Sequence, residues 1–150
     1  MRRAAVADPM APEAHFFDAN VLLYLLSADA RKADRAEALL AQGGTVSVQV
    51  LNEFLSVATR KACLPLSEAA EVLAAVRASC AVVPLTVGTH DRALDLLATH
   101  SLSVYDALIV AAALDAACTT LWTEDMQHGQ LIDGRLRLRN PFADDVSAPR

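Results

Sequence analysis

Residues 15–20, His-Phe-Phe-Asp-Ala-Asn, join a short apolar run to an acid that follows it directly. Phe16 and Phe17 predict a buried strand, and a helix is expected to begin near Asn20. Asp18 falls at the junction. Because removing water from a carboxylate is costly, acids are rarely buried without a partner. The stretch therefore indicates the first strand of an α/β fold, with an acid at its carboxyl end.

Three other stretches also place acids against apolar sequence. The acids are Glu53, Asp106, Glu124 and Asp125, within residues 48–54, 104–109 and 121–125. Something must make these repeated charges tolerable beside core-forming sequence, and a divalent cation is the most economical candidate. Hard cations such as Mg²⁺ take oxygen ligands and are usually held by one or two carboxylates, waters and a substrate phosphate. The four stretches together predict a metal-binding acidic pocket.

Strand-like and helix-like segments alternate along the chain. After the strand at residues 16–17, strands are expected over 45–48, 81–85, 119–123 and 135–139, with helices between them, one of which is capped by residues 89–91. Strands separated by helices imply an α/β fold with a parallel, doubly wound sheet of four to five strands flanked by helices. Such sheets bind ligands beyond the carboxyl ends of their strands. Because the acids follow strands or lie near the starts of helices, they can converge at that edge.

Each acid also has an ordinary structural interpretation. Asp18 could cap the following helix. Asp106 completes a capping-box pattern with Ser103, at a position that the helix dipole favours. Glu53 could be a solvated residue beside the core face of its helix, and the last two acids could belong to a polar turn. These alternatives stay open for each residue, but four acids at consistent topological positions favour a shared site.

The composition bounds the class of protein. The chain has 150 residues, of which 54% are hydrophobic, and this fits one domain with a real core. We expect the domain over residues 15–142, with tails at 1–14 and 143–150. No apolar run is long enough to cross a bilayer. Three widely spaced cysteines give no disulfide framework, so a cytoplasmic location is expected.

Charge and motifs narrow the chemistry further. The net charge of −5 argues against a protein that coats nucleic acid through bulk charge, although bound metal ions can supply a local positive field. The sequence has no Walker loop, no GxGxxG and no zinc-type histidine spacing. Trp122 and Tyr105 are expected in the core. If the chain binds a nucleic acid, the best candidates for contacts with its phosphate backbone are Arg31, Lys32, Arg35, Arg135, Arg137 and Arg139.

The acid-bearing stretches, in their order and spacing, resemble those of a PIN domain over roughly residues 15–142. More closely, the chain resembles a VapC-type ribonuclease toxin of a bacterial toxin–antitoxin pair. The segment from Asp125 to the Pro141-Phe142 pair also resembles one PIN subgroup. The resemblance implies a doubly wound sheet and Mg²⁺- or Mn²⁺-dependent hydrolysis of RNA phosphodiester bonds.

The resemblance also implies roles for individual residues. Carried over by position, the catalytic, metal-binding quartet is Asp18, Glu53, Asp106 and Asp125. Asn20 and Thr123 stand where the family has supporting polar residues. The segment after Asp106 holds one residue more than in many relatives, so Glu124 competes with Asp125 for the fourth position. The Thr-x-Asp pattern favours Asp125, and Glu124 is then a supporting residue.

The same resemblance implies partners, and two rival functions remain beside it. It implies a VapB-type antitoxin that covers the site and a homodimer, for which the apolar segments 21–26 and 67–76 are candidate interfaces. One rival is a catalytically silent PIN-like binding module. The other is a receiver-like phospho-acceptor domain, which should carry a lysine late in the fold, whereas none follows Lys61.

Overall fold

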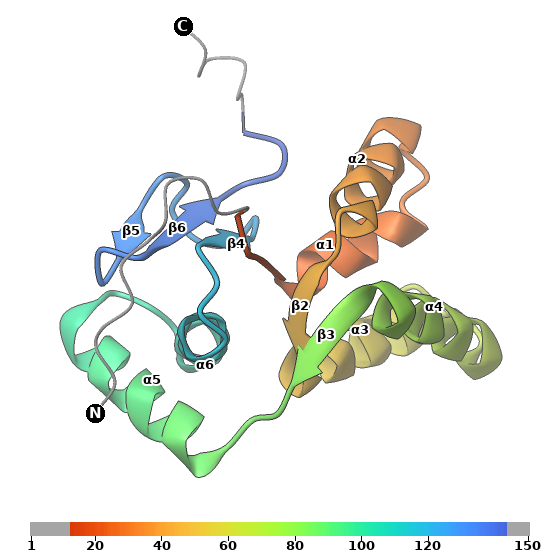
Figure 1. Ribbon diagram of the computed structural model, residues 1–150. Coiled ribbons are helices and arrows are strands. Elements are labelled where there is room, and N and C mark those ends of the chain that lie inside the picture. The colour runs from red at the N-terminus through yellow and green to blue at the C-terminus, as the bar shows by residue number, and fades with distance from the viewer. Residues whose placement is uncertain (1–12, 144–150) are drawn as a thin grey trace, which may run out of the picture.

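The computed structural model describes residues 13–143, and Figure 1 shows their arrangement. The strands are β1 (His15–Phe17), β2 (Gly44–Ser47), β3 (Cys80–Val83), β4 (Thr120–Trp122), β5 (Leu131–Ile132) and β6 (Leu136–Arg139). The helices are α1 (Ala19–Leu23), the short 3-10 helix η1 (Tyr24–Leu26), α2 (Ala30–Ala41), α3 (Val48–Arg60), α4 (Leu66–Ser79), α5 (Val87–Thr99) and α6 (Val104–Asp115). Most of the two predicted tails, 1–12 and 144–150, lies outside the described residues.

The strands form one six-stranded sheet in the order β3-β2-β1-β4-β6-β5. All neighbouring strands are parallel except β5, which runs antiparallel to β6. The predicted α/β fold with a doubly wound sheet is confirmed. It has one short strand more than expected, because the two residues of β5 are too few to show an alternating pattern. The strand order reverses between β1 and β4, and ligands bind at such a reversal.

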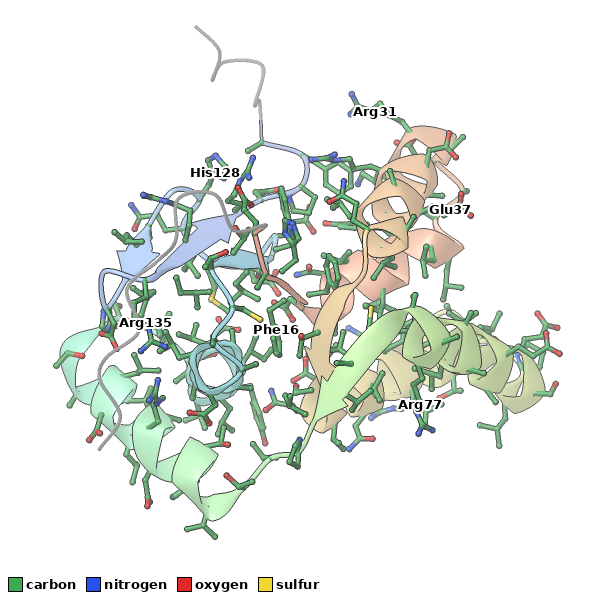
Figure 2. All side chains as sticks on the ribbon, in the orientation of Figure 1. Phe16, Arg31, Glu37, Arg77, His128 and Arg135 are labelled. Carbon is green, nitrogen blue, oxygen red and sulfur yellow. The ribbon has the colours of Figure 1, made fainter. Side chains whose placement is uncertain are left out.

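Helices cover both sides of the sheet. Figure 1 shows α5 and α6 on one side and α1 to α4 gathered on the other. Phe16 is fully buried and lies near the centre of the molecule in Figure 2, whereas the labelled Arg31 and Glu37 lie on the outer part of α2. Helix α6 packs against α5 and β2 and is buried on nearly every side, which explains why it has almost no polar face.

Helix starts depend on side chains that accept backbone N–H groups. Ser103 caps α6 as the sequence predicts, because its hydroxyl accepts the N–H of Asp106 at 3.2 Å. The start expected for α5 at residues 89–91 was wrong. Thr86 is the cap, and its hydroxyl and backbone N–H exchange hydrogen bonds with Thr89. The sequence signal was weak because this capping box uses a second threonine instead of the usual Glu or Gln.

Strands β1 and β2 approach each other unusually closely at Gly44. A Cβ atom placed there would lie 2.5 Å from Cε2 of Phe17 and 2.8 Å from the carbonyl oxygen of His15. Glycine is therefore required by space, and it lets the Phe17 ring fill the core beside β2.

Within residues 13–143, no single helix is long and apolar enough to cross a membrane. Helices α5 and α6 pass that test only when taken together, and they meet at an angle of 118°.

Candidate functional site

Asp18 lies where β1 ends and α1 begins, and it is only 3% exposed. Its Oδ1 accepts the backbone N–H of Ala19 at 2.6 Å, and its Oδ2 accepts the Thr123 hydroxyl at 2.7 Å. The backbone N–H of Asp18 donates to the carbonyl of Trp122, which ties the end of β1 to the end of β4. Asp18 is therefore a helix cap as well as a buried acid, and the two interpretations of the sequence are compatible.

The environment of Asp18 opposes its ionisation. Burial is the largest cause and raises the pKa of Asp18 from 3.8 to about 7. Hydrogen bonds from Thr123 and Ala19 lower this pKa, because they stabilise the charged form. The charges of Asp125 and Glu53 raise it again. Asp18 is thus electrostatically coupled to acids from two distant parts of the chain.

The loop after β4 is fastened to the start of α1. Thr123 donates to Asp18 while its Oγ1 accepts the backbone N–H of Asp125 at 3.2 Å. Asn20 donates from Nδ2 to Oδ2 of Asp125 at 3.0 Å, and its Oδ1 accepts the N–H of Glu124 at 3.4 Å. The structure thus brings the two supporting residues into contact with the first and last acids.

Glu124 and Asp125 have different surroundings. Asp125 bonds to Asn20, and its charge raises the pKa of both Asp18 and Asp106. Glu124 lies beside Tyr24 instead. Burial first, and then the interaction with Glu124, raises the pKa of Tyr24. The Tyr24 hydroxyl is buried and has no well-aligned hydrogen-bond partner in the described part of the chain. These contacts favour Asp125 over Glu124 as the fourth acid.

Asp106 and Glu53 come from two helices that begin at the same edge of the sheet. Asp106 lies in the first turn of α6, half-buried, and burial is the main cause that raises its pKa. The hydrogen bond with Ser103 lowers this pKa, and the charge of Asp125 raises it. Glu53 lies in α3, and its Oε2 accepts Nε2 of Gln49 at 2.8 Å. Each of the four acids therefore interacts with at least one other.

Sequence reasoning missed Gln49 and Tyr24. Gln49 precedes Glu53 by four residues, and side chains at that spacing lie on the same face of a helix, so the signal was present. No pattern in the sequence singled out Tyr24, because its proximity to Glu124 depends on how the loop after β4 packs against η1.

The donor set fits a hard divalent cation in its chemistry. In the described part of the chain, no three His, Cys, Asp or Glu side chains are close enough to enclose a metal ion by themselves. Mg²⁺ does not require such a cage, because it keeps several waters and uses one or two carboxylates. A cation would also relieve the conditions that raise the pKa values of Asp18 and Asp106.

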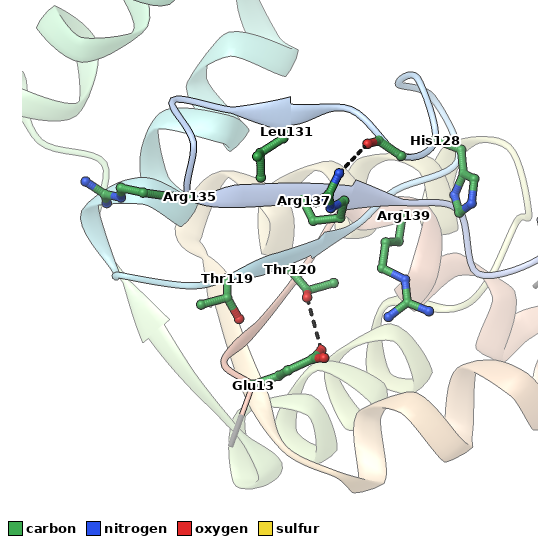
Figure 3. Close-up of a pocket in the computed structure, with 9 residues that line it drawn as sticks. Glu13, Thr119, Thr120, His128, Leu131, Arg135, Arg137 and Arg139 are labelled. Atoms are coloured by element: carbon green, nitrogen blue, oxygen red, sulfur yellow. Dashed lines mark hydrogen bonds between the residues drawn. The ribbon is translucent and has the colours of Figure 1, made fainter. Parts of the chain in front are cut away.

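A separate cavity of about 450 Å³ is lined by Arg135, just before β6, and by Arg137 and Arg139 of β6. Figure 3 shows this cavity together with Glu13 and His128. Arg137 donates to the carbonyl of Gly129 at 2.8 Å, and Arg135 donates to the carbonyl of Leu114 at 3.0 Å. The guanidinium of Arg139 lies 4.5 Å from the centre of the Trp122 ring. Each of the three arginines therefore has a structural contact, and Arg135 and Arg137 are exposed.

The basic residues of α2 differ in their contacts. Arg35 donates to the carbonyl of Pro141 at 3.1 Å and lies 5.5 Å from the centre of the Trp122 ring. Lys32 lies over the Tyr24 ring, and Arg31 is exposed. Trp122 is 3% exposed, as expected of a core residue. Tyr105 is 65% exposed, so its expected place in the core was wrong, because the first turn of α6 lies beyond the packed helix body.

The fold is similar to those of several solved structures. A toxin–antitoxin complex from Klebsiella pneumoniae has a TM-score of 0.66 at 20% identity, over 86% of this chain and 98% of that one. The VapC20 toxin of Mycobacterium tuberculosis, which cleaves the sarcin–ricin loop, has a TM-score of 0.58 at 22% identity, over 72% and 87%. VapBC2 from Rickettsia felis, bound to a promoter DNA fragment, has a TM-score of 0.62 at 17% identity, over 85% and 98%.

At identities this low, the structural likeness establishes the fold alone. No curated protein sequence matches the chain. The family model of the PIN domain, however, matches residues 15–131, which is most of the chain and includes Asp18, Asp106 and Asp125. The sequence match and the doubly wound sheet agree, and the chain belongs to the PIN domain family.

Proposed function

We propose that this chain is a divalent-metal-dependent endoribonuclease that hydrolyses RNA phosphodiester bonds, and that it is the toxin of a VapBC-type toxin–antitoxin pair. One observation carries the proposal. Asp18 is buried at the strand reversal, holds hydrogen bonds on both carboxylate oxygens, and is coupled to Glu53 and Asp125. A buried acid of this kind destabilises the folded state. A metal-dependent nuclease would use its charge to bind the metal ion.

The four acids of the proposed site would hold Mg²⁺ or Mn²⁺. When bound, the ion would polarise the phosphate, lower the pKa of a water and shield the leaving oxygen. The chain's own contribution is to orient the acids. Thr123 directs Oδ2 of Asp18 and holds the loop that carries Asp125, and Asn20 directs the Asp125 carboxylate.

The relatives support the choice of substrate and partner. VapC20 is a toxin that cleaves the sarcin–ricin loop, and other similar structures are toxin–antitoxin complexes. We therefore propose RNA as the substrate, a VapB-type antitoxin as the partner, and a cytoplasmic location. For a homodimer, residues 67–76 are the better candidate of the two segments. Most of that stretch of α4 is exposed, whereas Val21, Leu22 and Tyr24 of the other segment are committed to the core.

The alternative is a PIN-like module that binds a partner without catalysis. The presence of all four acids, with Asn20 and Thr123 already bonded to two of them, favours the enzyme. A receiver-like domain is disfavoured because the chain has no lysine after Lys61.

The decisive experiment is an RNA cleavage assay on a structured RNA, with wild type and Asp18→Asn, in Mg²⁺, in Mn²⁺ and in EDTA. Wild type should cleave only with metal. Asp18→Asn should lose at least about 100-fold in rate, because one charged oxygen ligand is gone and removal of a single electrostatic contributor has this order of effect. Equal rates for the two proteins would reject the assigned acid. Metal binding without cleavage of any RNA would favour the binding module.

A further inference from the structure

Gln49 joins the two helices that carry Glu53 and Asp106. It lies in the first turn of α3 and is only 8% exposed, although it is polar. Its Nε2 donates to Oε2 of Glu53 at 2.8 Å and to the carbonyl oxygen of Tyr105 at 3.2 Å. Tyr105 immediately precedes Asp106 in the first turn of α6. One amide group therefore contacts an acid of the proposed site and the backbone beside another.

The other end of the same amide has no partner. Oε1 of Gln49 is buried and accepts no hydrogen bond from the residues that the structure describes. A buried acceptor without a donor destabilises the folded state, and an apolar side chain of the same shape would avoid this cost. Packing alone therefore does not explain a glutamine at this position.

The surroundings of the amide indicate what it is for. Gln49, Glu53 and Tyr105 line one cavity of about 500 Å³, so the Glu53 carboxylate lies at a space that a ligand can enter. A glutamate side chain has several rotatable bonds, and a donor on the preceding turn restricts them. A hydrogen bond to a charged carboxylate is also stronger than one between neutral groups. Gln49 thus holds Glu53 in one orientation.

We propose that Gln49 is a positioning residue for the metal site, acting through Glu53 and through the first turn of α6. This inference rests on the proposed function, because it takes Glu53 and Asp106 as metal ligands. Groups that hydrogen-bond to metal ligands orient them, and their loss typically costs 10- to 100-fold in metal affinity or activity. On this interpretation, glutamine is present because its Nε2 donates to Glu53. The unpaired Oε1, which lowers the stability of the folded state, comes with the same amide group.

The test is Mn²⁺ binding by titration calorimetry to Gln49→Met, at a temperature where circular dichroism shows a folded chain. We expect binding about 10-fold weaker than in wild type. The melting temperature of the metal-free variant should equal or exceed that of wild type, because the unpaired acceptor is gone. Gln42→Met is the matched control, since Gln42 is an exposed amide that does not line this cavity, and it should bind Mn²⁺ within about twofold of wild type.

Two further variants separate positioning from a general structural role. Gln49→Glu keeps the length of the side chain, removes the donor and adds a like charge beside Glu53, so it should also weaken Mn²⁺ binding. In a Glu53→Gln background, Gln49→Met should change Mn²⁺ affinity less than it does in wild type, because the group it acts through is altered. With RNA, Gln49→Met should lower kcat and leave KM unchanged.

The outcomes are distinguishable from those of the proposed function. Gln49→Met or Gln49→Glu that binds Mn²⁺ as tightly as wild type overturns the role of Gln49, whatever the cleavage assay shows. Equal effects of Gln49→Met in the wild-type and Glu53→Gln backgrounds overturn the route through Glu53. A wild type that binds Mn²⁺ but cleaves no RNA overturns the nuclease and leaves the positioning role intact. A wild type that binds no Mn²⁺ overturns both.

Discussion

At the scale of single residues, two opposing effects act on the ionisation of Asp18. Its hydrogen bonds favour the charged carboxylate, while burial favours the neutral acid and raises its pKa to about 7. An acid with a raised pKa keeps a proton that the unfolded chain releases. The folded state then binds more protons between about pH 4 and pH 7, so stability falls as the pH rises through that window. At neutral pH, the site is therefore built at some cost to the fold.

This cost gives a prediction for Asp18→Asn in metal-free protein. At about pH 8 the variant should be more stable than wild type by about 1–3 kcal/mol. This is less than the roughly 4 kcal/mol that three pKa units represent, because an amide cannot keep both hydrogen bonds. Near pH 4 the advantage should disappear. Urea unfolding at both pH values in EDTA measures the difference. Asp133→Asn, which changes an exposed acid outside the site, is the control and should show no such dependence. A variant less stable than wild type at about pH 8 would contradict the burial argument.

At the scale of helices and strands, the sequence predicted most of the elements. Apolar runs located the strands that contain Phe16, Val46 and Leu121, because fully buried strands are short and continuous. Two features escaped prediction for a physical reason. Strand β5 is held by its partner β6 and has no pattern of its own, and the start of α5 depends on two threonines that a residue pattern cannot pair. Propensity describes local preference, whereas these features depend on tertiary neighbours.

Replacing two glycines by alanine should change the stability of the fold in opposite directions. Gly44→Ala should destabilise the fold by about 2–3 kcal/mol, because its Cβ would collide with the Phe17 ring and the backbone of β1. Gly88→Ala should stabilise it by about 0.5–1 kcal/mol, because Gly88 lies in α5 and its Cβ would meet nothing closer than 3.6 Å. Chemical denaturation of the two variants checks both signs. Equal effects would show that the close contact between β1 and β2 can relax.

At the scale of the whole molecule, chain topology assembles the site. Asp18 and Asp125 are far apart in sequence, yet β1 and β4 are neighbours, so the acid that ends one strand lies beside the loop that ends the other. The positions of the acids directly after strands predicted this convergence. The resemblance to a PIN domain indicated which acids form the quartet. The contact of Gln49 with Tyr105 and that of Tyr24 with Glu124 could not be predicted, because they depend on how α3 meets α6 and how the loop after β4 meets η1. The contact of Gln49 with Glu53 could have been predicted from their spacing on one helix.

Metal binding should therefore stabilise the molecule as a whole. At a Mg²⁺ or Mn²⁺ concentration of about 100 times Kd, the folded state gains about 2.7 kcal/mol by mass action. For a chain of this size, this corresponds to a rise in Tm of about 5–10 °C. Calorimetric melting curves with and without metal measure the shift, with NaCl at matched ionic strength as the control. Asp106→Asn should reduce the rise. An identical rise with NaCl alone would indicate general screening of charge.

Trp122 is the only tryptophan of the chain, and the loop that holds Thr123 and Asp125 follows it directly. Its indole N–H donates to His15, and the guanidinium groups of Arg35 and Arg139 lie over its ring. The fluorescence emission of this indole should therefore respond to the positions of the two guanidinium groups. It should also respond to movement of the loop from Thr123 to Asp125. The protein carries its own optical probe beside the loop that contains Asp125, and no external label is needed to follow events there.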